Sequence, residues 1–506
     1  MQHNIDTLLT ELRTTIAELG KGGGSISPSV YDTAQVLRLF PPEDPEPAFQ
    51  WLLAQQKADG GWGSPETPYA RDAPTLAAVL ALRTYRQTPT SQEAVDAGLR
   101  FLQQGVDQWR DAPIDALPIA AEMVLPYLLE DAKAVGLVLN TTPYASLYRL
   151  RSYKKQQINQ RSLQSGTPPT HSWETLDQSV ESILPDQSGG IGHSPAATAA
   201  WLQQAVKNPD LEEPCKRARR YLTQAAAATG VNISGVVPNV WPITGFELAY
   251  APYALLATGL LHHPTLCAAI EPIMDELWVI MQRGHGVSFG EYFTPDGDDT
   301  GLALGVLKAT SREVDPAFVL QFKNGDHFYT FHHELNPSVF ANAHALYGLA
   351  YAGRRYPATE HFLLERQSAD GRWLADKLHS SWLYTTLEVV LVLNHLGYSQ
   401  ELKKAAYALV QQQKADGGWG NGQSSTRAET SYALITLSTL QQRGLLSPAG
   451  LTALQRGYQM LHQGYRPSMA LDEALWLGKE LYAPRRVDRV YVLSALLSVA
   501  VERISV

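Results

Sequence analysis

Cysteine is nearly absent from this chain of 506 residues, which contains only Cys215 and Cys267. Two cysteines provide neither a framework of disulfides nor a cysteine-rich zinc cluster. We therefore expect a fold stabilised by a buried apolar core in a reducing, cytoplasmic setting. The chain is long enough to bury such a core and, by length alone, to form two or three domains.

An excess of positive charge is also absent. The chain has 41 Lys and Arg residues against 50 Asp and Glu residues, which gives a formal net charge of −9. This balance argues against a broad surface for nucleic acid, and no nucleic-acid partner is expected.

Long hydrophobic runs are missing as well. The most apolar stretch, Val490 to Val501, contains Ser494 and Ser498 and is shorter than the roughly 20 residues that span a bilayer. The N-terminus, with Asp6 and Glu11, does not resemble a signal peptide. No transmembrane segment is predicted, although docking on a membrane face stays open.

Patterns of alternating apolar and polar residues, typical of strands, are scarce, whereas helical spacing is common. Apolar residues recur at helical spacing up to Leu19, and three glycines then end that segment. The predicted fold class is therefore all-α. Further helices are predicted for residues 34–39, 48–55, 75–83, 94–103 and 429–437.

A repeated turn points to the architecture. The nine residues Gln55–Gly63, which read QQKADGGWG, recur letter for letter at Gln412–Gly420. Weaker copies occupy residues 186–192, 283–290 and 367–373. Because glycines permit tight turns at helix ends, this repeat is interpreted as a structural device that ties helical hairpins together. Its spread predicts that both halves of the chain are α/α barrels.

Three carboxylates crowd into four positions at Asp296, Asp298 and Asp299, directly before an apolar helix. One acid at such a place is usually an N-cap, but three exceed what capping requires. Since crowded carboxylates cannot all ionise easily, at least one should keep a proton at neutral pH. A calcium loop is excluded because its twelfth position, Leu307, lacks the required Glu. No metal site is predicted here.

These motifs together resemble those of class II terpene cyclases. Asp296–Asp299 resembles their Asp-x-Asp-Asp motif, and the repeated turn is similar to the repeat that these enzymes share with squalene–hopene cyclase. Further segments resemble bacterial and plant diterpene cyclases, and the likeness covers nearly the whole chain. These segments are Ser27–Ala34, Ala121–Glu130, Asn336–His344, Asp376–Ser380 and Tyr384–Thr386.

The resemblance implies two α/α barrels in the arrangement called γβ, with one barrel inserted into the other. Residues 1–22 would belong to the β barrel, 23–229 would form the γ-like barrel, and 230–506 would form the β-like barrel that carries the acid motif. Because an Asp-Asp-x-x-Asp motif is missing from the sequence, the class I α domain should be absent.

The resemblance also implies a reaction in which an acid protonates the terminal alkene of a linear prenyl chain. Asp298 would donate the proton, Asp296 and Asp299 would orient it, and Asn342 would be its hydrogen-bond partner. Carbocations need walls that stabilise charge without capturing it, as aromatic faces do. The residues expected to contact the substrate are Phe289, His344, Trp382 and Tyr384.

Three other functions compete with this interpretation. A protein prenyltransferase subunit would need zinc ligands that include a cysteine, and a glycosidase would need carboxylates on opposite sides of a sugar. A non-catalytic isoprenoid-binding protein would explain an aromatic cavity but not three clustered acids.

The substrate's head group is less well defined. Where related diterpene cyclases place a Lys before an Ile, this chain has Gln157-Ile158, and Lys154, Lys155 or Arg161 would have to substitute. A neutral amide suits a diphosphate poorly, which favours a prenylated aromatic substrate such as a farnesylated hydroxybenzoate. The alternative is geranylgeranyl diphosphate, cyclised to a copalyl- or halimadienyl-type bicycle. No cofactor is expected, except magnesium if the substrate is a diphosphate.

Overall fold

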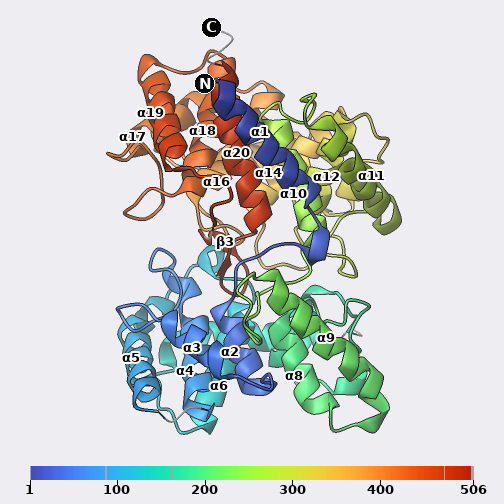
Figure 1. Cartoon of the computed structure of the whole chain (residues 1–506), viewed down its shortest axis with the longest axis vertical. Helices are drawn as coiled ribbons and strands as arrows, with labels where there is room; N and C mark the ends of the chain where they lie inside the picture. Colours follow the sequence, from blue (N-terminus) through green and yellow to red (C-terminus); the bar gives the residue numbers. More distant parts are fainter. Residues whose placement is uncertain (1, 86–87, 161–162, 472, 503–506) are drawn as a thin grey trace.

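The computed structural model describes residues 2–85, 88–160, 163–471 and 473–502. Figure 1 shows two helical lobes stacked along the long axis of the molecule. Among the described residues, extended structure is confined to short strands, β1 (Lys323–Asn324), β2 (His327–Phe328), β3 (Trp476–Leu477) and β4 (Leu481–Tyr482), and to isolated bridges. The predicted all-α class is confirmed.

The larger lobe is a barrel whose inner wall is a closed ring of helices. Each inner helix packs against the next one in the chain, and the last packs against the first. The pairing of α20 with α10 closes the ring, so the inner faces of all its members are removed from water. In ring order these helices are α10 (Thr244–Ala257), α12 (Gly297–Ala309), α14 (Val339–Tyr351), α16 (Trp382–Leu396), α18 (Arg427–Gln442) and α20 (Arg485–Glu502).

A second layer of helices covers this ring. The outer helices are α11 (Cys267–Gly284), α13 (Ala317–Leu320), α15 (Pro357–Glu365), α17 (Gln400–Gln412) and α19 (Pro448–Gly464). The N-terminal helix α1 (Gln2–Ala17) packs against α20 and α11 of this lobe, and its Leu8, Leu12 and Ile16 are buried in the lobe's core. The two ends of the chain therefore meet in one barrel (Figure 1).

The smaller lobe, between α1 and α10 in sequence, is built on a similar plan. Its inner elements are α2 (Val30–Leu39), α4 (Asp72–Tyr85), α6 (Ala121–Ala134), α8 (Pro195–Ala205) and the 3-10 helix η6 (Pro168–Thr175), which fills the place between α6 and α8. Its outer elements are α3 (Glu46–Ala54), α5 (Pro89–Gly105), α7 (Ala145–Asn159) and α9 (Glu212–Ala228).

The composition of residues 162–170, rich in Ser, Gly, Thr and Pro, predicts a surface loop, which is wrong for the last residues of the segment. Pro168, Pro169 and Thr170 begin η6, and Thr170 is buried. Composition favoured a loop, but the ring of the smaller lobe needs a member between α6 and α8. Ser162 lies outside the described residues.

The repeated turn connects helices as its composition suggests. Gln413 Nε2 donates to the carbonyls of Gly417 (2.7 Å) and Ala453 (2.8 Å), which joins the turn to α19. Trp419 Nε1 donates to the carbonyl of Leu409 at 2.8 Å, near the end of the preceding helix. The bond to Leu409 satisfies a carbonyl group that the end of α17 leaves without an intrahelical partner. Gln56 with Trp62 and Gln367 with Trp373 repeat the same geometry.

The two lobes are joined by a buried ionic cluster at the tip of the β3–β4 hairpin. Lys479 is fully buried and donates to Glu174 Oε1 of the smaller lobe at 2.7 Å and to Ser194 Oγ at 2.8 Å. Burial raises the pKa of Glu480 to about 8, although a hydrogen bond from Ser29 opposes the shift. The hairpin thus carries charges of the larger lobe into the smaller one.

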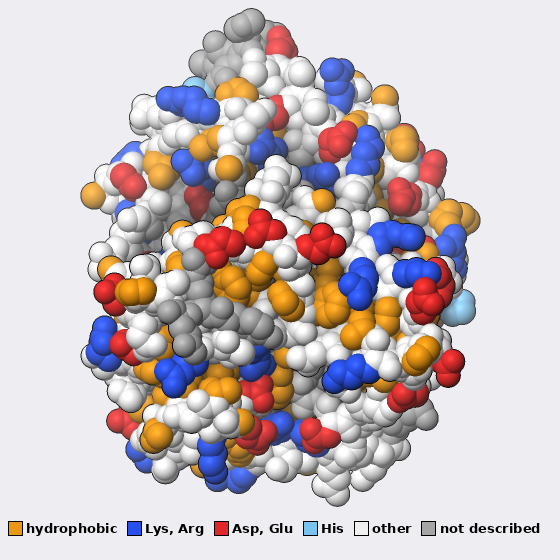
Figure 2. All heavy atoms as spheres, turned by 60° about the horizontal axis from the view of Figure 1, so that its bottom comes forward, with side chains coloured by type: hydrophobic (Ala, Val, Ile, Leu, Met, Phe, Trp, Pro, Cys, Tyr) orange, Lys and Arg blue, Asp and Glu red, His pale blue; other side chains and the backbone are white. Residues whose placement is uncertain are grey.

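No helix among the described residues is long and apolar enough to cross a membrane. Figure 2 shows the face on which the smaller lobe comes forward, with basic and acidic side chains interspersed among apolar ones.

Glu480 makes the stability of the lobe junction depend on pH. A carboxyl whose folded-state pKa lies above its ordinary value binds more protons in the folded state, so its stabilising effect is lost as pH rises between the two values. We expect Glu480→Gln to remove this dependence. Relative to wild type, its free energy of unfolding should rise between pH 5 and 8, with a slope of at most about 1.4 kcal/mol per pH unit.

Urea unfolding followed by circular dichroism at several pH values measures this difference. Asp177→Asn, at an exposed carboxylate paired with Lys155, is the matched control and should show no such trend. If the difference in free energy of unfolding between Glu480→Gln and wild type did not change with pH, the raised pKa of Glu480 would be contradicted.

Candidate active site

The three acids lie at the start of the inner helix α12. Asp296 is its N-cap, and its Oδ1 accepts hydrogen bonds from the backbone amides of Asp298 (3.0 Å) and Asp299 (2.8 Å). Asp296 therefore performs the capping that a single acid would perform. Position 297, between them, requires a glycine, because a Cβ atom there would lie only 2.1 Å from the carbonyl oxygen of Tyr329.

A degenerate copy of the repeated turn sets the position of this helix start. Thr300 Oγ1 accepts from the amide of Val287 at 3.0 Å. In two other copies of the turn, Thr386 and Thr430 accept from the amides of Trp373 and Trp419 in the same way. The acid motif thus occupies the helix start that follows a turn, with all three acids buried.

The carboxyl group of Asp298 lies between donors from two neighbouring helices. Its Oδ2 is 2.6 Å from the hydroxyl of Tyr250 on α10, which donates to it. Its Oδ1 is 2.6 Å from Nδ1 of His344 on α14. Asp298 is only 6% exposed, so these two groups provide the solvation that water would otherwise supply.

The electrostatics of the motif favour retained protons. Burial, reinforced by Asp298, raises the pKa of Asp296 to about 8. Burial and the two neighbouring carboxylates raise the pKa of Asp299 well above its usual range. Burial opposes the charged form of His344, but Asp298 and Glu388 outweigh it and raise the pKa of His344 to about 9. Asp296 and Asp299 are therefore favoured in their protonated forms near pH 7, while the surrounding carboxyl groups favour the imidazolium form of His344.

Asn342 has a different role from the predicted one. Its Nδ2 donates to the carbonyls of Phe328 (3.0 Å) and Ser338 (2.7 Å), and its Oδ1 accepts from the amide of Phe328. One amide hydrogen and the amide oxygen thereby hold strand β2 against α14, and the other hydrogen binds the N-cap residue of α14 itself. The partner of Asp298 on α14 is His344, because two residues along a helix correspond to about half a turn and a different face.

Aromatic side chains extend from Asp298 across the inner ring. Phe246 stacks on Tyr250 with ring centroids 4.0 Å apart, and Trp476 meets both rings edge-on at 5.0 and 5.1 Å. Tyr384 lies 4.9 Å from Trp476 and stacks on His379 at 4.2 Å. We call Phe246, Tyr250, His379, Tyr384 and Trp476 the aromatic cluster.

The remaining predicted contact residues lie in different surroundings. Phe289 packs at the junction of the lobes, 4.5 Å from Phe293 and 5.6 Å from His193 of the smaller lobe. Trp382 begins α16 and carries the guanidinium of Arg372, from the preceding turn, 5.0 Å above its ring. The structure thus brings Tyr384 and His344 to the acid's surroundings and places Trp382 beside a turn.

Sequence reasoning missed Tyr250, Phe246 and Trp476. Tyr250 lies 48 residues before Asp298, and Trp476 belongs to a short hairpin near the C-terminus. No local motif marks these residues, because only the packing of α10 against α12, and of the hairpin against α10, brings them to the site. From the sequence alone, these three aromatic residues would be assigned to the packed core.

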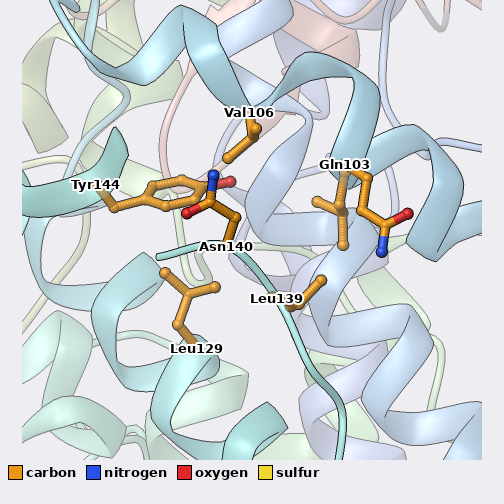
Figure 3. Close-up of a pocket in the computed structure, with 7 residues that line it drawn as sticks. Gln103, Val106, Leu129, Leu139, Asn140 and Tyr144 are labelled. Atoms are coloured by element: carbon orange, nitrogen blue, oxygen red, sulfur yellow. The ribbon is translucent and has the colours of Figure 1, made fainter. Parts of the chain in front are cut away.

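Two hollows lie elsewhere. Figure 3 shows a cavity in the smaller lobe surrounded by Val106, Leu129, Leu139 and Tyr144. Its volume of about 10 Å³ is close to the minimum for a single water. An open groove of about 680 Å³ lies at the lobe junction, lined by residues that include Gly22, Trp241 and Arg486. Neither hollow is lined by the three acids.

A protonated carboxyl group, buried beside a ring of aromatic faces, can deliver a proton to a weakly basic group such as an alkene.

Residues 342–478 match the family model described as squalene-hopene cyclase C-terminal domain. The chain is 40% identical to (+)-kolavenyl diphosphate synthase of Herpetosiphon aurantiacus, and the match covers 98% of each chain. It is 32% identical to copalyl diphosphate synthase of Streptomyces cyslabdanicus, over 94% of this chain and 92% of that one.

The solved structures agree with these matches. The chain superposes on ent-copalyl diphosphate synthase from Streptomyces platensis with a TM-score of 0.80 and 27% identity, over 98% of this chain and 99% of that one. The fold and the buried acid define a cyclase that starts its reaction by protonation. The chain belongs to the class II terpene cyclases, and its fold is the γβ double barrel of that family.

The positions of Tyr384 and Trp382 predict different effects on products. Replacing Tyr384 with Ala removes an aromatic face near Asp298, so carbocations should be captured earlier and give monocyclic or hydroxylated products. Trp382→Ala is the matched control, because its ring contacts a turn, and its product profile should match wild type. Gas chromatography with mass spectrometry checks both variants, and an unchanged profile for Tyr384→Ala would place that ring in the packed core alone.

Proposed function

We propose that this enzyme cyclises a linear C20 prenyl diphosphate, geranylgeranyl diphosphate, to a bicyclic diterpene diphosphate, and that Asp298 is the proton donor. The observation that carries the proposal is the buried contact of Asp298 with Tyr250 and His344 beside the aromatic cluster. The names of the similar proteins, kolavenyl and copalyl diphosphate synthase, support the diphosphate head group over the prenylated aromatic.

The chemistry requires an acid whose conjugate base is well stabilised. In the reactive form, the proton is held on Oδ2 of Asp298, the oxygen beside the Tyr250 hydroxyl. Transfer of this proton to the terminal alkene forms a C–H bond and leaves a tertiary carbocation and a carboxylate. His344 faces Oδ1 of that carboxylate and stabilises it as the negative charge develops. Asp296 orients the group by capping the helix that carries it.

The carbocation then moves along the substrate as successive alkenes attack it. The faces of Phe246, Tyr384 and Trp476 stabilise this charge without forming a bond to it. The cascade ends when a proton leaves, so the product is an isomer of the substrate and the diphosphate is retained.

Asp298→Asn tests the assignment of the acid. The amide keeps the shape of the side chain but cannot donate a proton of sufficient acidity, so we expect cyclisation to fall by more than about 1,000-fold. Asp299→Asn should reduce the rate less, because Asp299 contributes to the electrostatics of the motif and does not face Tyr250. Turnover of Asp298→Asn near the wild-type rate, with an unchanged circular dichroism spectrum, would contradict the role of Asp298.

Two lysines lie beside contacts between the lobes and can meet the head group. Lys377 of the larger lobe donates to Glu334 and to the carbonyl of Asn336, whose amide donates to Asp115 of the smaller lobe at 2.7 Å. The side chain of Lys377 is 11% exposed, and it directly follows Asp376. A cation at this depth retains more of its attraction for a phosphate than an exposed one does.

Lys154 is the corresponding cation of the smaller lobe. It pairs with Glu122 at the start of α6. Ile119, just before that helix, donates its amide to the carbonyl of Gly478 in the hairpin at 3.1 Å. Lys155 instead pairs with the exposed Asp177, and Arg161 lies outside the described residues.

Magnesium enters this proposal with the substrate. Among the residues that the structure describes, no group of three or more His, Cys, Asp and Glu side chains is arranged to hold a metal ion. Glu174 of the smaller lobe is already paired with the buried Lys479 at 2.7 Å. We therefore propose that the ion accompanies the diphosphate and occupies no site of its own before substrate binds.

The head group is tested by parallel assays with geranylgeranyl diphosphate and a farnesylated hydroxybenzoate, each with and without magnesium. We expect turnover of the diphosphate to a product of unchanged mass, detected after phosphatase treatment. Lys377→Gln and Lys154→Gln should each raise KM for the diphosphate by about tenfold or more, since each removes a charge-assisted hydrogen bond.

Lys155→Gln is the control for the two lysine variants and should leave KM unchanged. Turnover of the prenylated aromatic alone, without an effect of magnesium, would overturn the proposed head group but not the role of Asp298. Unchanged KM values in both variants would place the head group elsewhere.

A further inference from the structure

The far side of His344 faces a carboxylate that the proposed reaction does not use. His344 Nε2 lies 3.1 Å from Oε2 of Glu388, while Nδ1 lies 2.6 Å from Asp298. The three residues come from α12, α14 and α16, consecutive members of the inner ring. The imidazole is thus held between two carboxyl groups, and both His344 and Glu388 are fully buried.

Two tyrosines fix Glu388 in place. The hydroxyl of Tyr253 on α10 donates to Oε2, and the hydroxyl of Tyr491 on α20 donates to Oε1 at 3.3 Å. Among the Lys, Arg and His side chains that the structure describes, His344 is the one that pairs with Glu388. Four inner helices therefore converge on this carboxyl group.

A buried carboxylate is costly, and packing alone does not require one here. Taking a carboxylate out of water destabilises a fold unless a cation and hydrogen bonds compensate. The hydroxyls of Tyr253 and Tyr491 supply hydrogen bonds to its two oxygens but no positive charge. Among the described Lys, Arg and His side chains, the cation that offsets the charge of Glu388 is the imidazolium of His344, 3.1 Å away.

We propose that Glu388 is a positioning residue that keeps the imidazole of His344 charged and oriented, so that its Nδ1–H faces Oδ1 of Asp298 and stabilises the carboxylate left by proton transfer. Histidines that act through one ring nitrogen are commonly oriented by a carboxylate at the other. The inference depends on the class II reaction and on the geometry of Asp298, and it holds for either head group.

The groups that face His344 determine the direction of the pH dependence. On one side they are Asp298 of α12, with Asp296 and Asp299 beside it, and Tyr250 and Tyr253 of α10, with Tyr347 behind Tyr253. On the other side they are Glu388 of α16, with Tyr491 of α20 behind it. The tyrosines stay neutral because burial raises their pKa values well above 10. The carboxyl groups are thus what favours the imidazolium, while burial disfavours it.

The test compares Glu388→Gln with wild type in two measurements. First, kcat should fall about 10- to 100-fold with little change in KM, and the pH at which kcat declines on the alkaline side should move downwards. Second, the titration of His344, followed by NMR of protein labelled in its histidines, should shift to lower pH by about one unit or more, because one of two carboxylates is lost. A His344→Asn variant assigns the signal.

Matched variants separate this role from a general effect on packing. Glu429→Gln changes another buried carboxyl of the same barrel, held by Ser381, Thr426 and the amide of Asn421, and should alter neither measurement. Glu388→Asp keeps the charge and should recover part of both effects. Tyr491→Phe, which removes one hydrogen bond to Glu388, should give a smaller change in the same direction and remains informative if Glu388→Gln does not fold.

Two outcomes would overturn the proposal. One is a folded Glu388→Gln enzyme with wild-type kcat and pH profile. The other is a fall in kcat without a shift in the titration of His344, which would reduce Glu388 to a structural role. Because the NMR titration needs no substrate, its result is independent of the proposed head group.

Discussion

The cost of burying a carboxyl group is the constraint on which this structure depends. Asp298 is removed from water, so the barrel must supply hydrogen bonds from Tyr250 and His344 in its place. Those donors come from the two helices that flank α12 in the ring. The same dry surroundings that make the carboxyl group costly keep protons on the motif and protect a carbocation from water.

The closed ring of inner helices meets this requirement because it fixes where helix ends lie. The three best-preserved copies of the turn each lead from an outer helix to the next inner one, and their Gln and Trp side chains donate to carbonyls of the flanking outer helices. The turn before α12 keeps the hydroxyl-to-amide bond of Thr300 but has lost the tryptophan. The repeated turn thus fixes the positions of the inner helices, and the acid motif lies at the start of one of them.

The smaller lobe supports the site from outside the larger barrel. Its Glu174 holds Lys479 at the tip of the hairpin whose first strand contains Trp476. Trp476 touches Phe246, Tyr250 and Tyr384, so an ionic cluster at the lobe junction and the aromatic cluster beside Asp298 share one short hairpin. Contacts at the lobe junction therefore help to fix the position of Trp476 near Asp298, in addition to joining the two lobes.

The sequence by itself determined the helical class, the repeated turn and the position of the acid motif, because helical periodicity, glycine turns and N-capping are local. Only the tertiary structure decided the partners of Asp298. It replaced Asn342 with His344, placed Trp382 beside a turn, and added Tyr250, Trp476 and Glu388 from distant segments. Closure of a ring brings together residues separated by up to hundreds of positions, and local sequence carries no signal of which side chains will then face each other.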